Sequence, residues 1–251
     1  MAKELNMWRT VFNVLYFISC FIPYRPWRDW FRREKLFDYR AKLRALRHAF
    51  PRQDWRHFHL AKGGGSLVFV TPSGTVYKIR KFHLRDDSVT KFTREKRITD
   101  AVRSLLPVRV PNIKIHQIGV YTVYETKFIP GKILLSLPLK KIREYREQIG
   151  AELGNIIYIM FNAKLPELAD LRKNAVASGD IGLTHGDMCS NILVDPKTMK
   201  ITGIIDWEYA NFSPLWREFL GLFRVRRKMR LTDIAPVAMW TYYQLRDSTK
   251  K

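Results

Sequence analysis

The side chains best suited to catalysis lie close together in the C-terminal third of the chain. Asp187 and Asn191 lie in a loop that is closed by the apolar segment Ile192–Val194, and a second apolar segment, residues 201–205, delivers Asp206. Magnesium-dependent phosphoryl transfer needs a carboxylate that accepts the hydroxyl proton, and an amide with a second carboxylate that hold the metal. The pattern therefore predicts Asp187 as the catalytic base and Asn191 and Asp206 as Mg²⁺ ligands.

The residues around this loop resemble a known signature, His-Gly-Asp followed by Asn and then by Ile-Asp-Trp-Glu. It is similar to that of the aminoglycoside phosphotransferase and choline kinase family, whose members are distant relatives of protein kinases. The resemblance implies an ATP- and Mg²⁺-dependent kinase. In the kinase catalytic loop four residues separate the Asp from the Asn, whereas here only Met188, Cys189 and Ser190 do. The shorter loop keeps an inactive kinase fold open as an alternative.

A kinase also needs a glycine-rich turn and a lysine that hold the nucleotide phosphates. Glycines let backbone N–H groups approach phosphate oxygens without a Cβ in the way. The candidates for this turn are Gly63, Gly64, Gly65 and Ser66. Residues 75–80 predict a strand, and Lys78 in its middle is the candidate phosphate-binding lysine, with Arg80 and Lys81 as competitors.

The lysine of a kinase pairs with a glutamate on the next helix. Residues 86–106 have apolar side chains broadly at helical spacing, and Glu95 is the only glutamate among them. The resemblance implies that Glu95 pairs with Lys78. It also implies that the segment that follows, which ends in Ile-Pro-Gly, is the hinge, where backbone groups near Thr126 and Phe128 bind adenine.

The remaining sequence predicts a small helical second lobe. Residues 142–164 show apolar side chains at helical periodicity, which indicates a central buried helix. After Asp206 the chain lacks the activation segment with its Ala-Pro-Glu ending that protein kinases carry. A small molecule or a glycan is therefore favoured as the acceptor over a protein side chain.

Together these observations predict an α+β, bilobal, protein-kinase-like fold, with a small antiparallel-sheet N-lobe and a mainly helical C-lobe. We expect a basic amphipathic extension at residues 1–55, the N-lobe at 56–129 and the C-lobe at 130–251. A length of 251 residues and a hydrophobic content of 46% fit one such globular protein. The two cysteines, Cys20 and Cys189, provide no disulfide framework and fit a reducing compartment.

The net charge of +22 is not explained by a kinase fold. Residues 1–62 hold 14 Lys and Arg against 5 Asp and Glu, and residues 224–230 form a second basic cluster. Nucleic acid and an anionic membrane surface are the two partners that such charge favours, and simple solubility is the third explanation.

The N-terminus favours the membrane. Residues 10–24 carry no charge, but they fall short of the roughly 20 residues that span a bilayer. Residues 25–35 then interleave tryptophans with arginines, which is typical of an interfacial helix. The stretch from Phe21 to Arg44 is also similar to the N-terminal part of some bacterial lipopolysaccharide and capsule enzymes. Packing of the apolar segment on the kinase lobe is the alternative.

We therefore predict a cytoplasmic, ATP- and Mg²⁺-dependent phosphotransferase, peripheral on the inner face of the cytoplasmic membrane. Its acceptor is a hydroxyl of a small molecule or of a surface-glycan precursor. A catalytically inactive scaffold at the membrane and a nucleic-acid-binding protein are the alternatives, with nucleic acid the less favoured partner. The sequence identifies neither the acceptor nor the oligomeric state.

Overall fold

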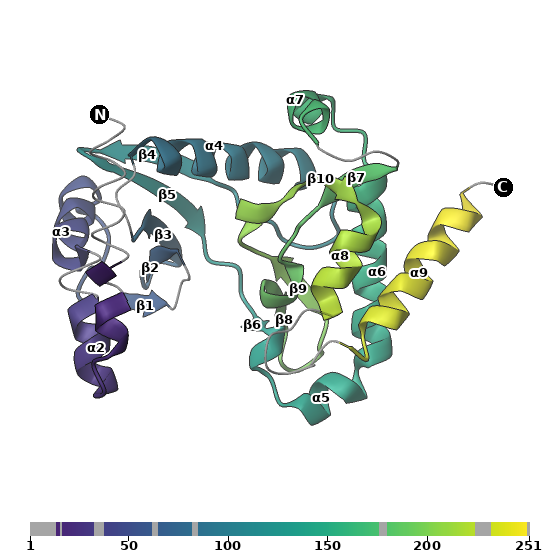
Figure 1. The fold of residues 1–251 in the computed structure, drawn as a ribbon, viewed down its shortest axis with the longest axis horizontal. Helices are drawn as coiled ribbons and strands as arrows, with labels where there is room; N and C mark the ends of the chain where they lie inside the picture. The colour runs from purple at the N-terminus through teal and green to yellow at the C-terminus, as the bar shows by residue number, and fades with distance from the viewer. Residues whose placement is uncertain are drawn as a thin grey trace. The chain divides into compact units, whose positions relative to one another are not determined.

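The chain is divided into two compact units in a computed structural model, which describes residues 14–15, 17–32, 38–61, 65–81, 85–175, 180–223 and 232–249. The first unit holds Met1–Thr93 and Lys114–Phe128, and the second holds Arg94–Ile113 and Ile129–Lys251 (Figure 1). The chain therefore passes from the first unit into the second, returns, and crosses again after Phe128.

The first unit is built on an antiparallel sheet with the strand order β1-β2-β3-β5-β4. Its strands are β1 (His59–Ala61), β2 (Ser66–Val70), β3 (Thr75–Arg80), β4 (Lys114–Ile118) and β5 (Tyr121–Lys127). Strand β3 has the bounds predicted from its alternating side chains. Because successive side chains of a strand point to opposite faces, Tyr77 and Ile79 are buried on one face and Lys78 lies on the other.

Helix α3 (Tyr39–Ala49) packs on the sheet face that carries Tyr77 and Ile79. Leu46 of the helix is fully buried in one apolar cluster with these two side chains. The ring of Phe50, just after the helix, lies 4.6 Å from that of Tyr77. The basic N-terminal region is therefore part of the core of this unit from α3 onward, whereas α2 (Arg25–Phe31) precedes it in sequence.

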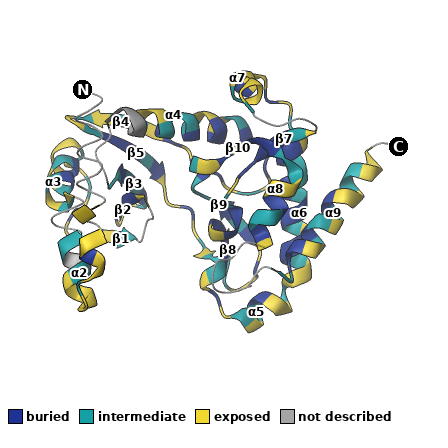
Figure 2. Ribbon diagram, in the orientation of Figure 1, coloured by how far each residue is buried: buried dark blue, intermediate teal, exposed yellow. Residues whose placement is uncertain are grey.

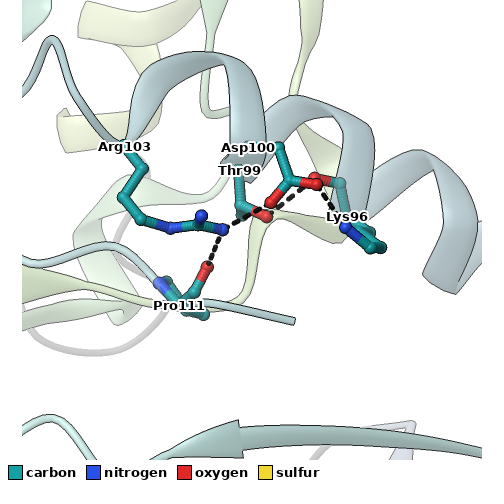
Figure 3. A network of polar contacts seen from close by, with 5 residues as sticks. All are labelled: Lys96, Thr99, Asp100, Arg103 and Pro111. Carbon is teal, nitrogen blue, oxygen red and sulfur yellow. Dashed lines mark hydrogen bonds and ion pairs between the residues drawn. The ribbon is translucent and has the colours of Figure 1, made fainter. Parts of the chain in front are cut away.

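Helix α4 (Arg85–Val102) ends four residues earlier than the periodicity predicts. Residues 103–105 form a turn instead, in which the N–H groups of Leu105 and Leu106 both donate to the Val102 carbonyl. Arg103 fixes this end of the helix, because its guanidinium binds the Asp100 carboxylate at 2.5 Å and the Pro111 carbonyl at 3.1 Å (Figure 3). Asp100 also pairs with Lys96.

The second unit is mainly helical. Its helices are α5 (Leu139–Glu144), α6 (Arg146–Asn162), α7 (Ala169–Lys173), α8 (Leu215–Phe223) and α9 (Ala235–Ser248). Its short strands form two antiparallel groups, the pair β7 (Ile181–Thr184) and β10 (Asn211–Pro214), and the sheet β6 (Lys132–Ile133), β8 (Ile192–Val194) and β9 (Ile201–Ile204). These strands carry the predicted catalytic residues at their ends.

Helix α6 is the central buried helix of this unit, as predicted, and its apolar side chains from Ile149 to Phe161 include many that are buried (Figure 2). The predicted single helix over residues 142–164 is wrong at its start. The chain breaks at Tyr145 (φ −104°, ψ 17°), so that Ile142 belongs to the separate helix α5. Gly154 lets α6 approach α9 closely, because a Cβ there would lie 2.5 Å from the Ala238 carbonyl oxygen.

Among the described residues no helix is long and apolar enough to cross a bilayer.

Candidate active site

The loop that carries Asp187 follows a strand of the second unit, and this strand is paired with a second one. Strand β7 leads into His185, Gly186 and Asp187, and β10 pairs with β7 in antiparallel register, with Thr184 opposite Asn211. Gly186 has a left-handed conformation (φ 80°), and a Cβ there would lie 2.8 Å from the Tyr209 carbonyl oxygen. The segment around Tyr209 therefore passes directly beside the loop that carries Asp187. Glycine suits position 186 because it tolerates both the left-handed backbone and this close approach.

Glu218 anchors the main chain of this loop. Its Oε2 accepts hydrogen bonds from the N–H groups of His185 at 2.7 Å and Gly186 at 3.1 Å. Glu218 is only 2% exposed although it lies on a helix. Burial raises the pKa of its carboxyl from 4.5 to about 7, the two N–H donors lower it, and the charge of Asp187 raises it.

His185 fixes the same loop from within the core. Its Nε2 lies 3.1 Å from the Ile205 carbonyl oxygen. A carbonyl can only accept, so Nε2 donates, and Nδ1 then accepts the N–H of Asp187 at 3.4 Å. Burial lowers the pKa of His185 to about 4, which keeps the ring neutral near pH 7, as this pattern of hydrogen bonds requires.

The shortened loop between Asp187 and Asn191 is a single 3₁₀ turn, η4 (Met188–Ser190). The Asn191 side-chain amide donates to the Asp187 carbonyl at 2.8 Å and to the Asp187 carboxylate at 3.2 Å. The Ser190 hydroxyl donates to the other carboxylate oxygen at 2.8 Å. Asp187 and Asn191 are therefore in direct contact although the loop has one residue fewer than in kinases.

Asp206 follows β9, next to the start of β8. These strands pair with Ile192 opposite Ile204, and the Ile205 N–H donates to the Asn191 carbonyl at 3.1 Å. Asp206 has a left-handed backbone (φ 62°, ψ 64°), which aspartate adopts more readily than most residues. The structure therefore brings Asn191 and Asp206 to the same edge of this small sheet.

Helix α4 secures the segment after Asp206. Glu95, which is 1% exposed, accepts the N–H of Trp207 at 3.2 Å. Arg94, one residue before it, donates to the carbonyl of Ala210 at 2.6 Å and to that of Glu208 at 3.5 Å. Glu95 thus contacts the main chain next to a predicted metal ligand. Its predicted pairing with Lys78 stays a prediction, since the two residues belong to different units.

The residues at this edge fit a magnesium ion. The Nδ2 of Asn191 donates to Asp187, which leaves its oxygen for a cation, and Asp206 adds a carboxylate. Mg²⁺ is commonly bound by one or two carboxylates together with substrate phosphates. The described part of the chain holds no group of three or more His, Cys, Asp and Glu side chains that could hold a metal ion by themselves.

The predicted nucleotide-binding residues lie mostly in the first unit. Gly63 and Gly64 lie outside the described residues. Gly65 directly precedes β2, whose first residue, Ser66, is buried, and a Cβ at Gly65 would lie 3.0 Å from the Nη1 atom of Arg80. The Lys78 ammonium lies 4.8 Å from the ring centroid of Tyr124, which is opposite it on β5.

The predicted hinge has one backbone group already in use. The N–H of Phe128 donates to the Gly74 carbonyl at 2.8 Å. Thr126 is 8% exposed on β5, whereas Phe128 is 50% exposed. If this segment binds a base, it does so through backbone groups other than the Phe128 N–H.

The part of the chain that carries these residues is similar to known phosphotransferases. The sequence model described as "Phosphotransferase enzyme family" matches residues 143–247, which include Asp187, Asn191 and Asp206. The predicted resemblance to the aminoglycoside phosphotransferase family is confirmed. The match also bears out the predicted enzyme class, a phosphotransferase with an alcohol group as acceptor. No curated protein sequence matches the chain.

Solved structures confirm the kinase-like fold. The ternary complex of APH(2")-IIa with streptomycin and ATP is 12% identical, with a TM-score of 0.58 over 82% of this chain and 83% of that one. Macrolide 2'-phosphotransferase MphH from Brachybacterium faecium is 16% identical, with a TM-score of 0.59 over 80% and 82%. Aminoglycoside-3'-phosphotransferase of type VIII is 17% identical, with a TM-score of 0.59 over 85% and 93%.

The sequence interpretation missed Glu218 and Arg94. Glu218 had a detectable signal, because it precedes Phe219 and lies one turn before Leu222, both of which are buried on α8. A carboxylate on the apolar face of a short helix indicates a specific buried partner. Arg94 had no such signal, since it lies in a helix rich in basic residues.

We expect the buried carboxyl of Glu218 to make stability depend on pH. Because its pKa is raised from 4.5 to about 7 in the folded protein, the unfolded chain loses this proton at lower pH. The free energy of unfolding therefore loses a contribution as the pH rises from 4.5 to about 7. Glu218→Gln should gain stability relative to the wild type across this window and level off above it.

Chemical denaturation at several pH values measures this difference, and Glu144→Gln, at an exposed site on α5, is the matched control. A difference between Glu218→Gln and the wild type that does not change with pH would contradict the assignment.

Proposed function

We propose that this protein transfers the γ-phosphoryl group of ATP to a hydroxyl of a small molecule, with Mg²⁺ as the cofactor. The observation that carries the proposal is the contact between Asp187 and Asn191 through the Asn191 amide, at 2.8 and 3.2 Å. It keeps a carboxylate and an amide oxygen together just before the start of β8, which is the arrangement that phosphoryl transfer requires.

In this proposal Asp187 accepts the proton of the acceptor hydroxyl. Hydrogen bonds from Ser190 and Asn191 orient its two carboxylate oxygens. Asn191 and Asp206 would hold Mg²⁺, which would neutralise negative charge on the phosphates of the ATP that supplies the phosphoryl group. From the sequence we assign phosphate binding to Lys78 and to the glycine turn.

The acceptor is proposed to be a small polar molecule, and a surface-glycan precursor is the finer proposal. The solved relatives named above are described as acting on aminoglycosides or macrolides. Tyr209 supports a ring-shaped acceptor, because it is 63% exposed and its backbone lies against Gly186, next to Asp187. An exposed aromatic ring with a hydroxyl offers both an apolar face and a hydrogen bond to such a molecule.

We also propose that the N-terminal segment attaches the enzyme to an anionic membrane. Large apolar side chains are exposed there, with Phe17 at 63%, Phe21 at 71% and Trp27 at 69%. Arg32, the residue after α2, donates to the Ser19 hydroxyl at 2.7 Å and so links α2 to the helical residues 17–20. Exposed aromatic side chains next to arginines suit the interface of an anionic bilayer. This attachment would bring the enzyme to lipid-linked acceptors.

The competing function is an inactive scaffold, and the shorter catalytic loop is the observation that favours it. Asp187→Ala separates the two. If Asp187 is the base, this variant should bind ATP nearly as the wild type does but transfer phosphate about 10²–10⁴-fold more slowly.

A coupled assay of nucleotide turnover against sugars and amino alcohols measures this effect, with Asp247→Ala on α9 as the control for loss of a carboxylate. Nucleotide binding by the wild type without any turnover would support the scaffold. Turnover of Asp187→Ala at the wild-type rate would exclude Asp187 as the base.

The membrane attachment is tested by replacing Phe17, Phe21 and Trp27 with serine. Vesicles containing phosphatidylserine should sediment the wild type, and added salt should weaken binding, since each basic residue contributes about 1 kcal/mol near such a surface. The triple variant should lose sedimentation and keep its melting temperature, whereas Trp240→Ser, at a site on α9 where the tryptophan is 66% exposed, should still bind.

Equal sedimentation of the triple variant would contradict the attachment. Binding of the wild type to nucleic acid in preference to vesicles would favour a nucleic-acid-binding function.

A further inference from the structure

Helix α3 buries a lysine completely. Lys42 is 0% exposed and lies one turn before Leu46, which is also fully buried, on the side of the helix that packs on the sheet. Its ammonium donates to the carbonyl of Lys81 at 2.9 Å. Burial lowers the pKa of Lys42 to about 8, and the nearby charge of Asp38 opposes this effect.

The acceptor of this hydrogen bond lies at the end of β3. Lys81 is the residue after the strand, and its own N–H donates to the carbonyl of Gly65 at 3.0 Å. Gly65 is the last residue of the glycine run and precedes β2, whose first residue, Ser66, pairs with Arg80. Two consecutive hydrogen bonds therefore connect α3 to the exit of the glycine turn.

An apolar side chain would fill this position more simply. Burying an ammonium costs free energy, and replacing buried charged groups by apolar ones of similar volume is often neutral or stabilising. A lysine at this site is therefore not explained by the packing of α3 on the sheet. What it adds is a directed, charge-assisted hydrogen bond to one backbone carbonyl.

We propose that Lys42 is a positioning residue for nucleotide binding, through which α3 holds the backbone at Lys81 and Gly65 in place. The helix thereby fixes the backbone that leaves the proposed phosphate-binding glycines at Gly65, and it couples the N-terminal region to nucleotide affinity. The proposal rests on the proposed kinase function. It predicts an effect on substrate binding and leaves the transfer step, carried out by residues of the second unit, unchanged.

Lys42→Met tests it, since methionine has a similar volume and no donor. Without this hydrogen bond the backbone at Lys81 and Gly65 is held less firmly, so KM for ATP should rise about 10-fold, or about 1.4 kcal/mol, while kcat changes little. Arg44→Met on the exposed side of α3 is the matched control and should leave both constants unchanged. Lys42→Arg, which keeps a donor, should restore most of the affinity.

Amide hydrogen exchange of the full-length chain gives a readout that does not depend on catalysis. Exchange of the Lys81 amide, which donates to the Gly65 carbonyl, should be faster in Lys42→Met than in the wild type, with an unchanged melting temperature. If the wild type proves not to bind ATP, faster exchange still supports the connection while the kinase function fails. Unchanged exchange and an unchanged KM in Lys42→Met would overturn the proposal. A fall in both kcat and the melting temperature would also overturn it, because Lys42 would then support the fold in general and not nucleotide binding in particular. If Lys42→Met does not fold, loss of ATP affinity in Lys42→Arg at wild-type stability would overturn it.

Discussion

The hydrogen bonds from the Asn191 amide to Asp187 hold the proposed catalytic base beside a proposed Mg²⁺ ligand. In a loop one residue shorter than that of kinases, the proposed base and the proposed metal ligand could have been moved apart. The 3₁₀ turn at residues 188–190 closes the gap, and the amide contacts both the carbonyl and the carboxylate of Asp187. Because the Asn191 nitrogen makes these hydrogen bonds, its oxygen is left as the atom that would bind a cation, so a single side chain would serve both halves of the proposed site.

The rest of the second unit keeps this loop in place with buried polar groups. Glu218 holds the N–H groups of His185 and Gly186, His185 spans Ile205 and Asp187, and Glu95 holds Trp207. Each of these groups would be costly to bury without its partner. Their combined effect is to fix the backbone on both sides of the proposed metal site, so that the site is organised before any ligand binds.

The sequence predicted the parts of the fold that depend on local patterns. Alternation in β3 and the order of Asp187, Asn191 and Asp206 were sufficient to place strand and loop. The break at Tyr145 could not be predicted, because Ile142 keeps the helical spacing of α6 although it belongs to α5. The burial of Lys42 and Glu218 depends on long-range packing, and charged residues on a helix are usually exposed. The use of the Phe128 N–H by Gly74 likewise depends on strand pairing.

In the proposed site this short loop and Asp206 together bind Mg²⁺. Calorimetric measurement of ATP affinity with Mg²⁺ and with excess chelator, for the wild type and Asp206→Asn, tests it most directly. Asparagine tolerates the left-handed backbone of this position, so the variant should keep its fold and lose mainly the charge of the ligand. Mg²⁺ should tighten ATP binding to the wild type, and Asp206→Asn should lose this gain. An equal gain from Mg²⁺ in both proteins would contradict the proposed metal site.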